Sequence, residues 1–150
     1  MTDADQGAAR ALVKSKTFGA LATIARDGGH PFATLVGYAL VADTAGATPV
    51  FLLSTLAEHT QNLLRDARAS LLVTEDGEGD PLARGRVTLV GRCAEIPRDD
   101  VAAEYLLRHP RAAQYLTMVD FGFWRLAVEN VRYVGGFGKM GWIEGADWLA

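Results

Sequence analysis

Short apolar runs separated by turn residues at hairpin spacing constrain the fold of this chain more than any other feature. The apolar run at residues 17–25 is followed by "RDGGH" at residues 26–30, in which Asp-Gly-Gly is a strong turn signal. The chain returns through the apolar residues 31–42, turns again at residues 43–49 and continues through the apolar residues 50–54. Runs joined by so few residues are typical of neighbours in an antiparallel sheet. This part of the chain therefore predicts three consecutive antiparallel strands.

The rest of the chain adds strand patterns with helical patterns between them. Further strands are predicted at residues 69–76 and 86–96, and one or two more within residues 121–138. Helices are predicted at Ala8–Lys16, after residue 54, and in the segments 97–109 and 110–116, with Asp99 or Asp100 as the cap of the third. Roughly six strands, mostly joined as hairpins, with inserted helices predict a mainly β (α+β) fold, a small antiparallel barrel.

A doubly wound dinucleotide-binding sheet is not predicted. Such a sheet needs a glycine-rich turn between its first strand and the helix that follows. The glycine-rich stretch "GGFGKMG" at residues 135–141 instead follows the last predicted strand.

Size and charge narrow the function classes. The 150 residues fit one domain, residues 1–150, and 49% hydrophobic with 22% charged residues are ordinary for a folded protein. The formal net charge of −3 does not suit a general nucleic-acid binder, which needs a basic excess to neutralise phosphates. We therefore expect a small-molecule ligand or substrate and no nucleic-acid partner.

The compartment is predicted from cysteine use and from apolar segments. Cys93 is the single cysteine, so no intramolecular disulfide can form, which fits a reducing compartment. The first ten residues lack the pattern of a signal peptide, and no apolar stretch has the length of a membrane span. The three histidines have no paired metal-binding spacing, so no metal site is predicted. We expect a cytoplasmic protein without a membrane partner.

A row of polar residues interrupts the apolar segment "LLSTLAEHTQNLLRDARASLLV", residues 52–73. Thr55 followed by Glu58 matches a capping box, and Leu56, Leu63 and Leu64 fall on one helical face. One interpretation is a capped helix with solvated polar residues. The other is a ligand site beside the turn, because a helix start favours anions. Its contacts would be Ser54, His59, Thr60 and Asn62.

The strand predicted at residues 86–96 has two different faces. Arg86, Thr88 and Arg92 share one face, and Val87, Leu89, Gly91 and Cys93 share the other. The polar face offers donors to a phosphate or to the carbonyl edge of a ring, and it equally suits a half-exposed strand.

Other candidates have equally plain alternatives. Thr34 and Tyr38 could lie against a flat aromatic ligand or belong to a core strand. Lys139 and Trp142 are grouped with Arg132 and four glycines near the end of the chain, where Trp142 could simply be buried. Cys93 and His109 are interpreted as structural. Since no Ser/His/Asp or Cys/His arrangement is visible, a cofactor is expected to carry any chemistry.

Four segments together resemble the pyridoxamine 5′-phosphate oxidase-like, FMN-binding split-barrel superfamily, and most closely its haem-utilisation branch. The segments are "FGALATIARDGGHPFATLVGYAL", "PVFLLSTLAEHTQNLLRDARASLLV", "GRVTLVGRCAEI" and "FWRLAVENVRYVGGFGKMGW". The resemblance covers nearly the whole chain, from about Ala8 to Trp142. It implies a split β-barrel of roughly six to seven antiparallel strands with short flanking helices, assembled as a homodimer with FMN at the subunit interface.

The resemblance also assigns roles to residues. It implies that the ribityl phosphate of FMN is held by Ser54, Thr55, His59 and Thr60, with Asn62 nearby. It implies that the ring is flanked by Thr34, Leu35, Val36 and Tyr38, and that the other subunit contributes Arg86 and Thr88. The implied activity is that of a flavin-dependent oxidoreductase.

Departures from the family pattern keep other functions open. Typical members have an arginine–lysine pair where this chain has His59-Thr60, and their pyridoxamine-specific residues have no counterpart here. One alternative is a haem-binding or haem-degrading protein with His59, His30 or His109 as the axial ligand. Another is a flavin-binding module without catalysis.

Overall fold

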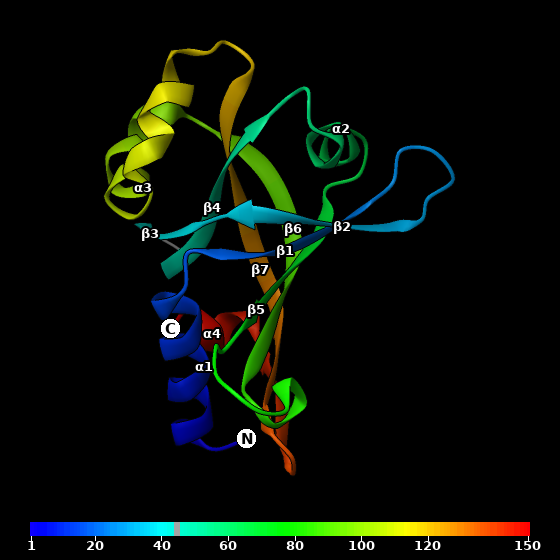
Figure 1. The fold of residues 1–150 in the computed structure, drawn as a ribbon, viewed down its shortest axis with the longest axis vertical. Coiled ribbons are helices and arrows are strands. Elements are labelled where there is room, and N and C mark those ends of the chain that lie inside the picture. The colour runs from blue at the N-terminus through cyan, green and yellow to red at the C-terminus, as the bar shows by residue number, and fades with distance from the viewer. Residues whose placement is uncertain (44–45) are drawn as a thin grey trace.

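One antiparallel sheet forms the centre of the computed structural model, which describes residues 1–43 and 46–150 (Figure 1). Within these residues the sheet has eight strands in the order β2-β1-β5-β6-β7-β4-β3, and β8 pairs with β7. The strands are β1 Phe18–Ile24, β2 Pro31–Gly37, β3 Ala39–Asp43, β4 Gly46–Ser54, β5 Arg68–Thr74, β6 Arg86–Ile96, β7 Phe121–Gly136 and β8 Lys139–Glu144. The predicted mainly β, antiparallel fold is confirmed.

Short helices flank the sheet. They are α1 Asp3–Ser15, α2 Glu58–Arg65, α3 Ala102–Arg108 and α4 Gly145–Trp148, with the 3₁₀ turns η1 Pro81–Ala83, η2 Arg98–Asp100 and η3 Pro110–Thr117. Helices α2 and α3 lie on either side of β4 in Figure 1. Within the described residues, no helix has the length and apolar character required to cross a bilayer.

The single strand predicted over residues 31–42 is wrong, because the chain breaks at Tyr38 into β2 and β3. These two strands lie at opposite ends of the sheet order. Tyr38 is fully buried, its hydroxyl donates to the carbonyl oxygen of Val13 at 2.5 Å, and its N–H donates to that of Thr17 at 2.8 Å. The break adds one strand, and β8 at Lys139–Glu144, beyond the predicted strand residues 121–138, adds another, so the sheet has eight strands where six to seven were predicted.

Two predicted boundaries also change. Helix α1 begins at Asp3 instead of Ala8, because Thr2 and Asp5 form a reciprocal capping box. Hydrogen bonds from Thr2 lower the pKa of Asp5. Neither Asp99 nor Asp100 caps α3: both lie in η2, and the N-cap of α3 is Val101, without a side-chain bond. The turn predicted at residues 43–49 is too long, because Asp43 ends β3 and residues 46–49 belong to β4; residues 44–45 lie outside the described residues.

The alternation predicted for β6 is confirmed. Val87, Leu89 and Cys93 are buried in the main core, and the side chains of Arg86 and Thr88 face outward, partly exposed. Burial raises the pKa of the Cys93 thiol to about 12. The outward row continues across the sheet, because Thr88 is in register with Leu72 of β5 and Arg132 of β7.

A register shift between β6 and β7 fixes a close approach of the two backbones. The shift lies between Val90 and Gly91. A Cβ atom at Gly91 would lie 1.9 Å from the carbonyl oxygen of Ala127. Because backbone atoms cannot move away as a flexible side chain can, only glycine fits at this position.

We expect Gly91→Ala to lower the free energy of unfolding by roughly 3 kcal/mol, since the new methyl group forces the strands apart. Gly7→Ala is the matched control, because it lies inside α1 with no atom within 4 Å of its added Cβ. That substitution is expected to stabilise the protein by about 1 kcal/mol. Urea unfolding monitored by circular dichroism checks both, and equal midpoints for the two variants would contradict the assignment.

The Cys93 thiol is expected to resist alkylation in the folded protein. Burial and a pKa of about 12 keep it protonated at pH 8, whereas the thiolate is the reactive form. Iodoacetamide should label native protein roughly a hundredfold more slowly than urea-unfolded protein, as followed by mass spectrometry. Equal labelling rates would mean that the β6 face is open to reagents.

Candidate functional site

Two adjoining cavities lie where β2 and β4 end, between α2 and the α3–η3 segment. The smaller has a volume of about 230 Å³ and the larger about 520 Å³. Both are lined by Gly37, Leu52 and Phe121. The shared lining makes them two ends of one groove, and the groove includes part of the predicted site.

The smaller cavity contains the predicted residues Leu35, Val36, Ser54 and His59. Thr34 lies behind it, with its hydroxyl 3.0 Å from His59 Nδ1. Burial lowers the pKa of His59, so the imidazole is uncharged at neutral pH. Predicted site residues of β2, β4 and α2 thus meet at one cavity.

The hydrogen-bond donors of the turn after β4 are engaged within the chain. Ser54 Oγ donates to the Asp120 carboxylate at 2.7 Å and accepts from the N–H of Leu56 at 3.1 Å. The N–H of Thr55 donates to the carbonyl oxygen of Asp120 at 2.8 Å, and that of Ala57 to Ser54 at 3.1 Å. The backbone N–H groups of Thr55, Leu56 and Ala57 are thus already hydrogen-bonded, and the Ser54 hydroxyl is bonded to the Asp120 carboxylate.

The predicted capping box of α2 is wrong. The helix begins after Ala57, which has no side-chain cap, and Thr55 lies too far before it to serve. The Glu58 carboxylate instead accepts from the Arg26 guanidinium at 2.9 Å. The predicted face of three leucines is also wrong: Leu63 is buried, whereas Leu56 and Leu64 are 86% and 57% exposed.

Thr60 and Asn62 lie on the buried face of α2 and do not line either cavity. The Asn62 amide donates to Thr23 Oγ1 at 3.0 Å and accepts from the N–H of Arg26 at 2.9 Å, which fastens α2 to the end of β1. The Thr60 hydroxyl has no partner among the described residues.

The remaining predicted residues lie apart from the groove. Tyr38 supports the core, as described above. Thr88 and Trp142 lie on the outer face of the sheet, in a cross-strand row that starts at Leu35 of the smaller cavity and continues through Ala20, Leu72, Thr88 and Arg132 to Trp142. Arg86 lies in the next row, and its guanidinium donates to the carbonyl oxygen of Leu82. Trp142 is 60% exposed, and the Arg132 guanidinium lies over its ring in a cation–π contact. Lys139 is the first residue of β8 and is exposed.

The larger cavity is walled by aromatic rings that sequence analysis did not single out. Tyr105 stacks on His109 with ring centroids 4.7 Å apart, and Tyr115 stacks on Phe121 at 4.9 Å. Phe18 meets His109 edge to face at 5.4 Å. Tyr105 and His109 are one helical turn apart, so their spacing was a local signal for this wall. Burial raises the pKa of Tyr105 to about 12.

His109 is oriented by a backbone contact. Its Nε2 lies 2.7 Å from the carbonyl oxygen of Tyr38, which can only accept, so Nε2 carries a proton. In the neutral ring this leaves Nδ1 as an acceptor or a metal ligand. In residues 1–43 and 46–150, no three His, Cys, Asp or Glu side chains gather as a metal-binding cluster.

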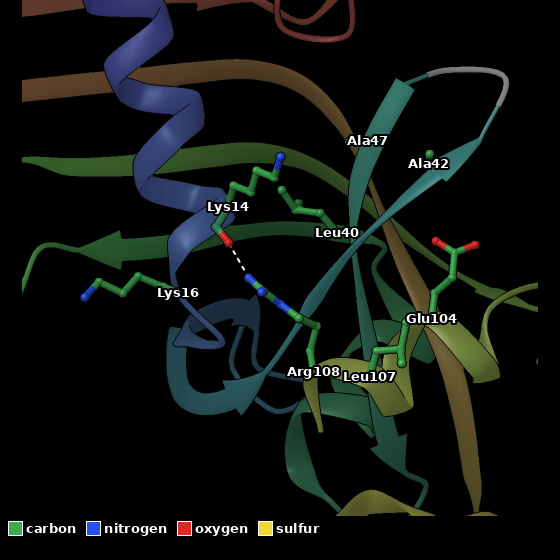
Figure 2. A pocket seen from close by; sticks show the side chains of 8 residues that line it. All are labelled: Lys14, Lys16, Leu40, Ala42, Ala47, Glu104, Leu107 and Arg108. Atoms are coloured by element: carbon green, nitrogen blue, oxygen red, sulfur yellow. Dashed lines mark hydrogen bonds between the residues drawn. The ribbon is translucent and has the colours of Figure 1, made fainter. Parts of the chain in front are cut away.

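Arg108 and Arg111 bring positive charge to the larger cavity. The Arg108 guanidinium donates to the carbonyl oxygen of Lys14 at the end of α1, as Figure 2 shows. Arg108 also borders a hollow of about 400 Å³ on its other side, between α1, β3, β4 and α3 (Figure 2). Lys16 points away from that hollow and pairs with Asp76 at 2.5 Å. The bond to α1 holds the Arg108 charge at the boundary between the two spaces.

Comparisons with known proteins identify the family of this chain. The family model described as CREG, beta-barrel matches residues 2–150. The chloroplastic heme oxygenase HOZ of Arabidopsis thaliana is 34% identical over 131 residues, which are 85% of this chain and 39% of HOZ. The chain therefore spans about two fifths of that curated relative.

Solved structures share the fold. A heme binding protein from Mycobacterium smegmatis has a TM-score of 0.87 and 35% identity, over 99% of this chain and 61% of that one. A Clostridium acetobutylicum protein of the pyridoxinephosphate oxidase family, related to general stress protein 26, has a TM-score of 0.71. At 16% identity, over 96% of both chains, it shows the fold alone. The chain belongs to the CREG β-barrel family and has the split-barrel fold of the pyridoxamine 5′-phosphate oxidase-like superfamily.

Proposed function

We propose that this chain binds haem in the larger cavity. The proposal is supported by the two relatives at 34% and 35% identity, whose names are those of a heme oxygenase and a heme binding protein. The observation that carries it is His109, an imidazole held in an aromatic cavity by a bond from Nε2 to a backbone carbonyl.

The residues of the larger cavity fit a flat, apolar ring with acidic substituents. Stacked aromatic side chains offer faces for such a ring. Arg108 and Arg111 offer donors for carboxylates. A histidine whose other nitrogen donates to a backbone carbonyl is the usual arrangement of a metal ligand. The volume of about 520 Å³ lies in the range of small-molecule sites.

The residues lining the larger cavity would have different roles toward a bound haem. The aromatic walls would exclude water from the ring, Arg108 and Arg111 would hold its carboxylates, and His109 would be the residue that holds the iron. Haem, when bound, supplies iron-centred redox chemistry, whose potential depends on such ligands.

Titration of the purified protein with haem, monitored by its Soret absorption, should show saturable binding. His109→Ala is expected to weaken binding roughly tenfold or more and to shift the Soret band. His59→Ala should change affinity by less than about threefold, and His30→Ala, in the exposed β1–β2 turn, should not change it. Circular dichroism controls for folding, because His109 also bonds to Tyr38.

Two outcomes contradict the haem proposal. Absence of a Soret change with wild-type protein rejects haem binding altogether. If the Soret band is lost in His59→Ala and kept in His109→Ala, the haem ligand is His59 and the haem site is the smaller cavity.

We propose further that two copies pair through the outer face of β5, β6, β7 and β8. Exposed apolar side chains gather there, including Leu72, Val90, Met140 and Trp142. An apolar group of this kind on a soluble protein marks an interface. Pairing would also bring Arg86 and Thr88 of one copy toward the groove of its partner.

Trp142→Glu is expected to shift the protein from dimer to monomer in analytical ultracentrifugation, since it places a charge in the pairing face. Leu56→Glu is the control, because Leu56 is similarly exposed but lies in the turn before α2. A wild-type monomer at micromolar concentration, or equal sedimentation of the two variants, argues against this interface.

A flavin is the second candidate ligand, and a flavin-dependent oxidoreductase the corresponding activity. The observation in its favour is that Leu35, Val36 and His59 meet at one cavity, as a ring site requires. A bound flavin supplies hydride transfer. A flavin-binding module without catalysis would bind the same ring and show no turnover with nicotinamide donors. FMN, however, does not fit in full, because the turn that should hold its phosphate has its donors engaged.

A further inference from the structure

We infer that the smaller cavity accepts an uncharged, hydroxyl-bearing group, and that Asp120 is the specificity-determining residue that excludes phosphate from it. This inference concerns the smaller cavity and is independent of haem binding in the larger one. It rests on the donors, the charges and the acceptors around the turn from Ser54 to Ala57.

The backbone N–H donors of the turn are not free to hold a phosphate. Phosphate sites at turns and helix starts use several free backbone N–H groups. Here the N–H groups of Thr55, Leu56 and Ala57 are directed to Asp120, to Ser54 Oγ and to the Ser54 carbonyl oxygen. A phosphate would therefore have to break bonds that hold the turn in place.

Ser54 is equally committed. Its hydroxyl proton points to the Asp120 carboxylate at 2.7 Å, and its oxygen accepts from Leu56. Within the described lining of the smaller cavity, Ser54 is the one hydroxyl residue. A phosphate oxygen at Ser54 would compete with a carboxylate for the same proton.

The charges act in the same direction. No lysine or arginine is among the described residues lining the smaller cavity, and His59 is uncharged at neutral pH. Arg26, packed against α2, is engaged by Glu58. The Asp120 carboxylate, bonded to Ser54, thus places negative charge at the turn, and a phosphate dianion beside it would be repelled.

The acceptors define what the smaller cavity favours. The Asp120 carboxylate keeps acceptor capacity beyond its bond to Ser54, and the His59 imidazole has Nε2 left for a ligand, because Nδ1 lies 3.0 Å from Thr34 Oγ1. A ligand hydroxyl can donate to the carboxylate and can pair with Nε2 as donor or acceptor, and the apolar lining of Leu35, Val36 and Phe121 suits the carbon skeleton of a polyol chain. A ribityl chain without its phosphate has this chemistry.

Riboflavin and FMN test the inference, since they differ only in the phosphate. Binding is measured by quenching of flavin fluorescence for wild-type protein, Asp120→Asn and the control Asp99→Asn. Asparagine keeps an acceptor for Ser54 and removes the charge, whereas Asp99 is exposed in η2.

We expect wild-type protein to bind riboflavin at least as tightly as FMN. Asp120→Asn should tighten FMN binding by roughly tenfold and change riboflavin binding by less than about threefold. Asp99→Asn should leave the ratio unchanged.

Three results would overturn the inference. The first is that wild-type protein binds FMN about tenfold more tightly than riboflavin, and the second is that Asp120→Asn changes the affinity for both flavins equally. The third is that neither wild-type protein nor Asp120→Asn binds either flavin. Haem titration of Asp120→Asn distinguishes failure of this inference from failure of the proposed haem binding. The haem affinity of Asp120→Asn should match that of wild-type protein, whether or not the ratio of FMN to riboflavin affinity changes.

Discussion

The buried Tyr38 joins the parts of this protein on which its candidate site depends. Its hydroxyl is bonded to the last turn of α1, its N–H to Thr17, and its carbonyl oxygen receives the Nε2–H of His109. Burial raises the pKa of the phenol far above its usual value, so it remains a donor at any physiological pH. One residue thus ends β2, turns the chain toward β3 and orients the imidazole of the larger cavity.

The groove follows from that break. With β2 and β3 at opposite ends of the sheet order, the end of β2 meets α2 on one side and the α3–η3 segment on the other. Gly37 leaves the space for this meeting, since a Cβ there would lie 3.0 Å from His109. The two ends of the groove differ in chemistry: one is aromatic with arginines, and the other is small, with the Asp120 carboxylate behind Ser54. This contrast motivates haem for the first and an uncharged group for the second.

Local patterns in the sequence predicted what depends on near neighbours. The bounds and alternation of β6 were correct because side chains in a strand alternate whatever the strand pairs with. The segment from Ser54 to His59 was identified because polar residues interrupt an apolar run. The capping box failed because Glu58 bonds to Arg26, and Asp120 went unnoticed because its contact with Ser54 joins residues far apart in the chain.

The sequence by itself determined the antiparallel class, most strands and the polar turn after β4, since turn chemistry and period-two burial are encoded over a few residues. Only the tertiary structure decided where the strand at residues 31–42 breaks, which aromatic side chains form a cavity, and which hydroxyl groups are already bonded. Those outcomes depend on burial and on hydrogen bonds between distant segments, such as Tyr38 with Val13 and Ser54 with Asp120. Such bonds form because a polar group removed from water needs a partner, and the partner's position in the sequence is arbitrary.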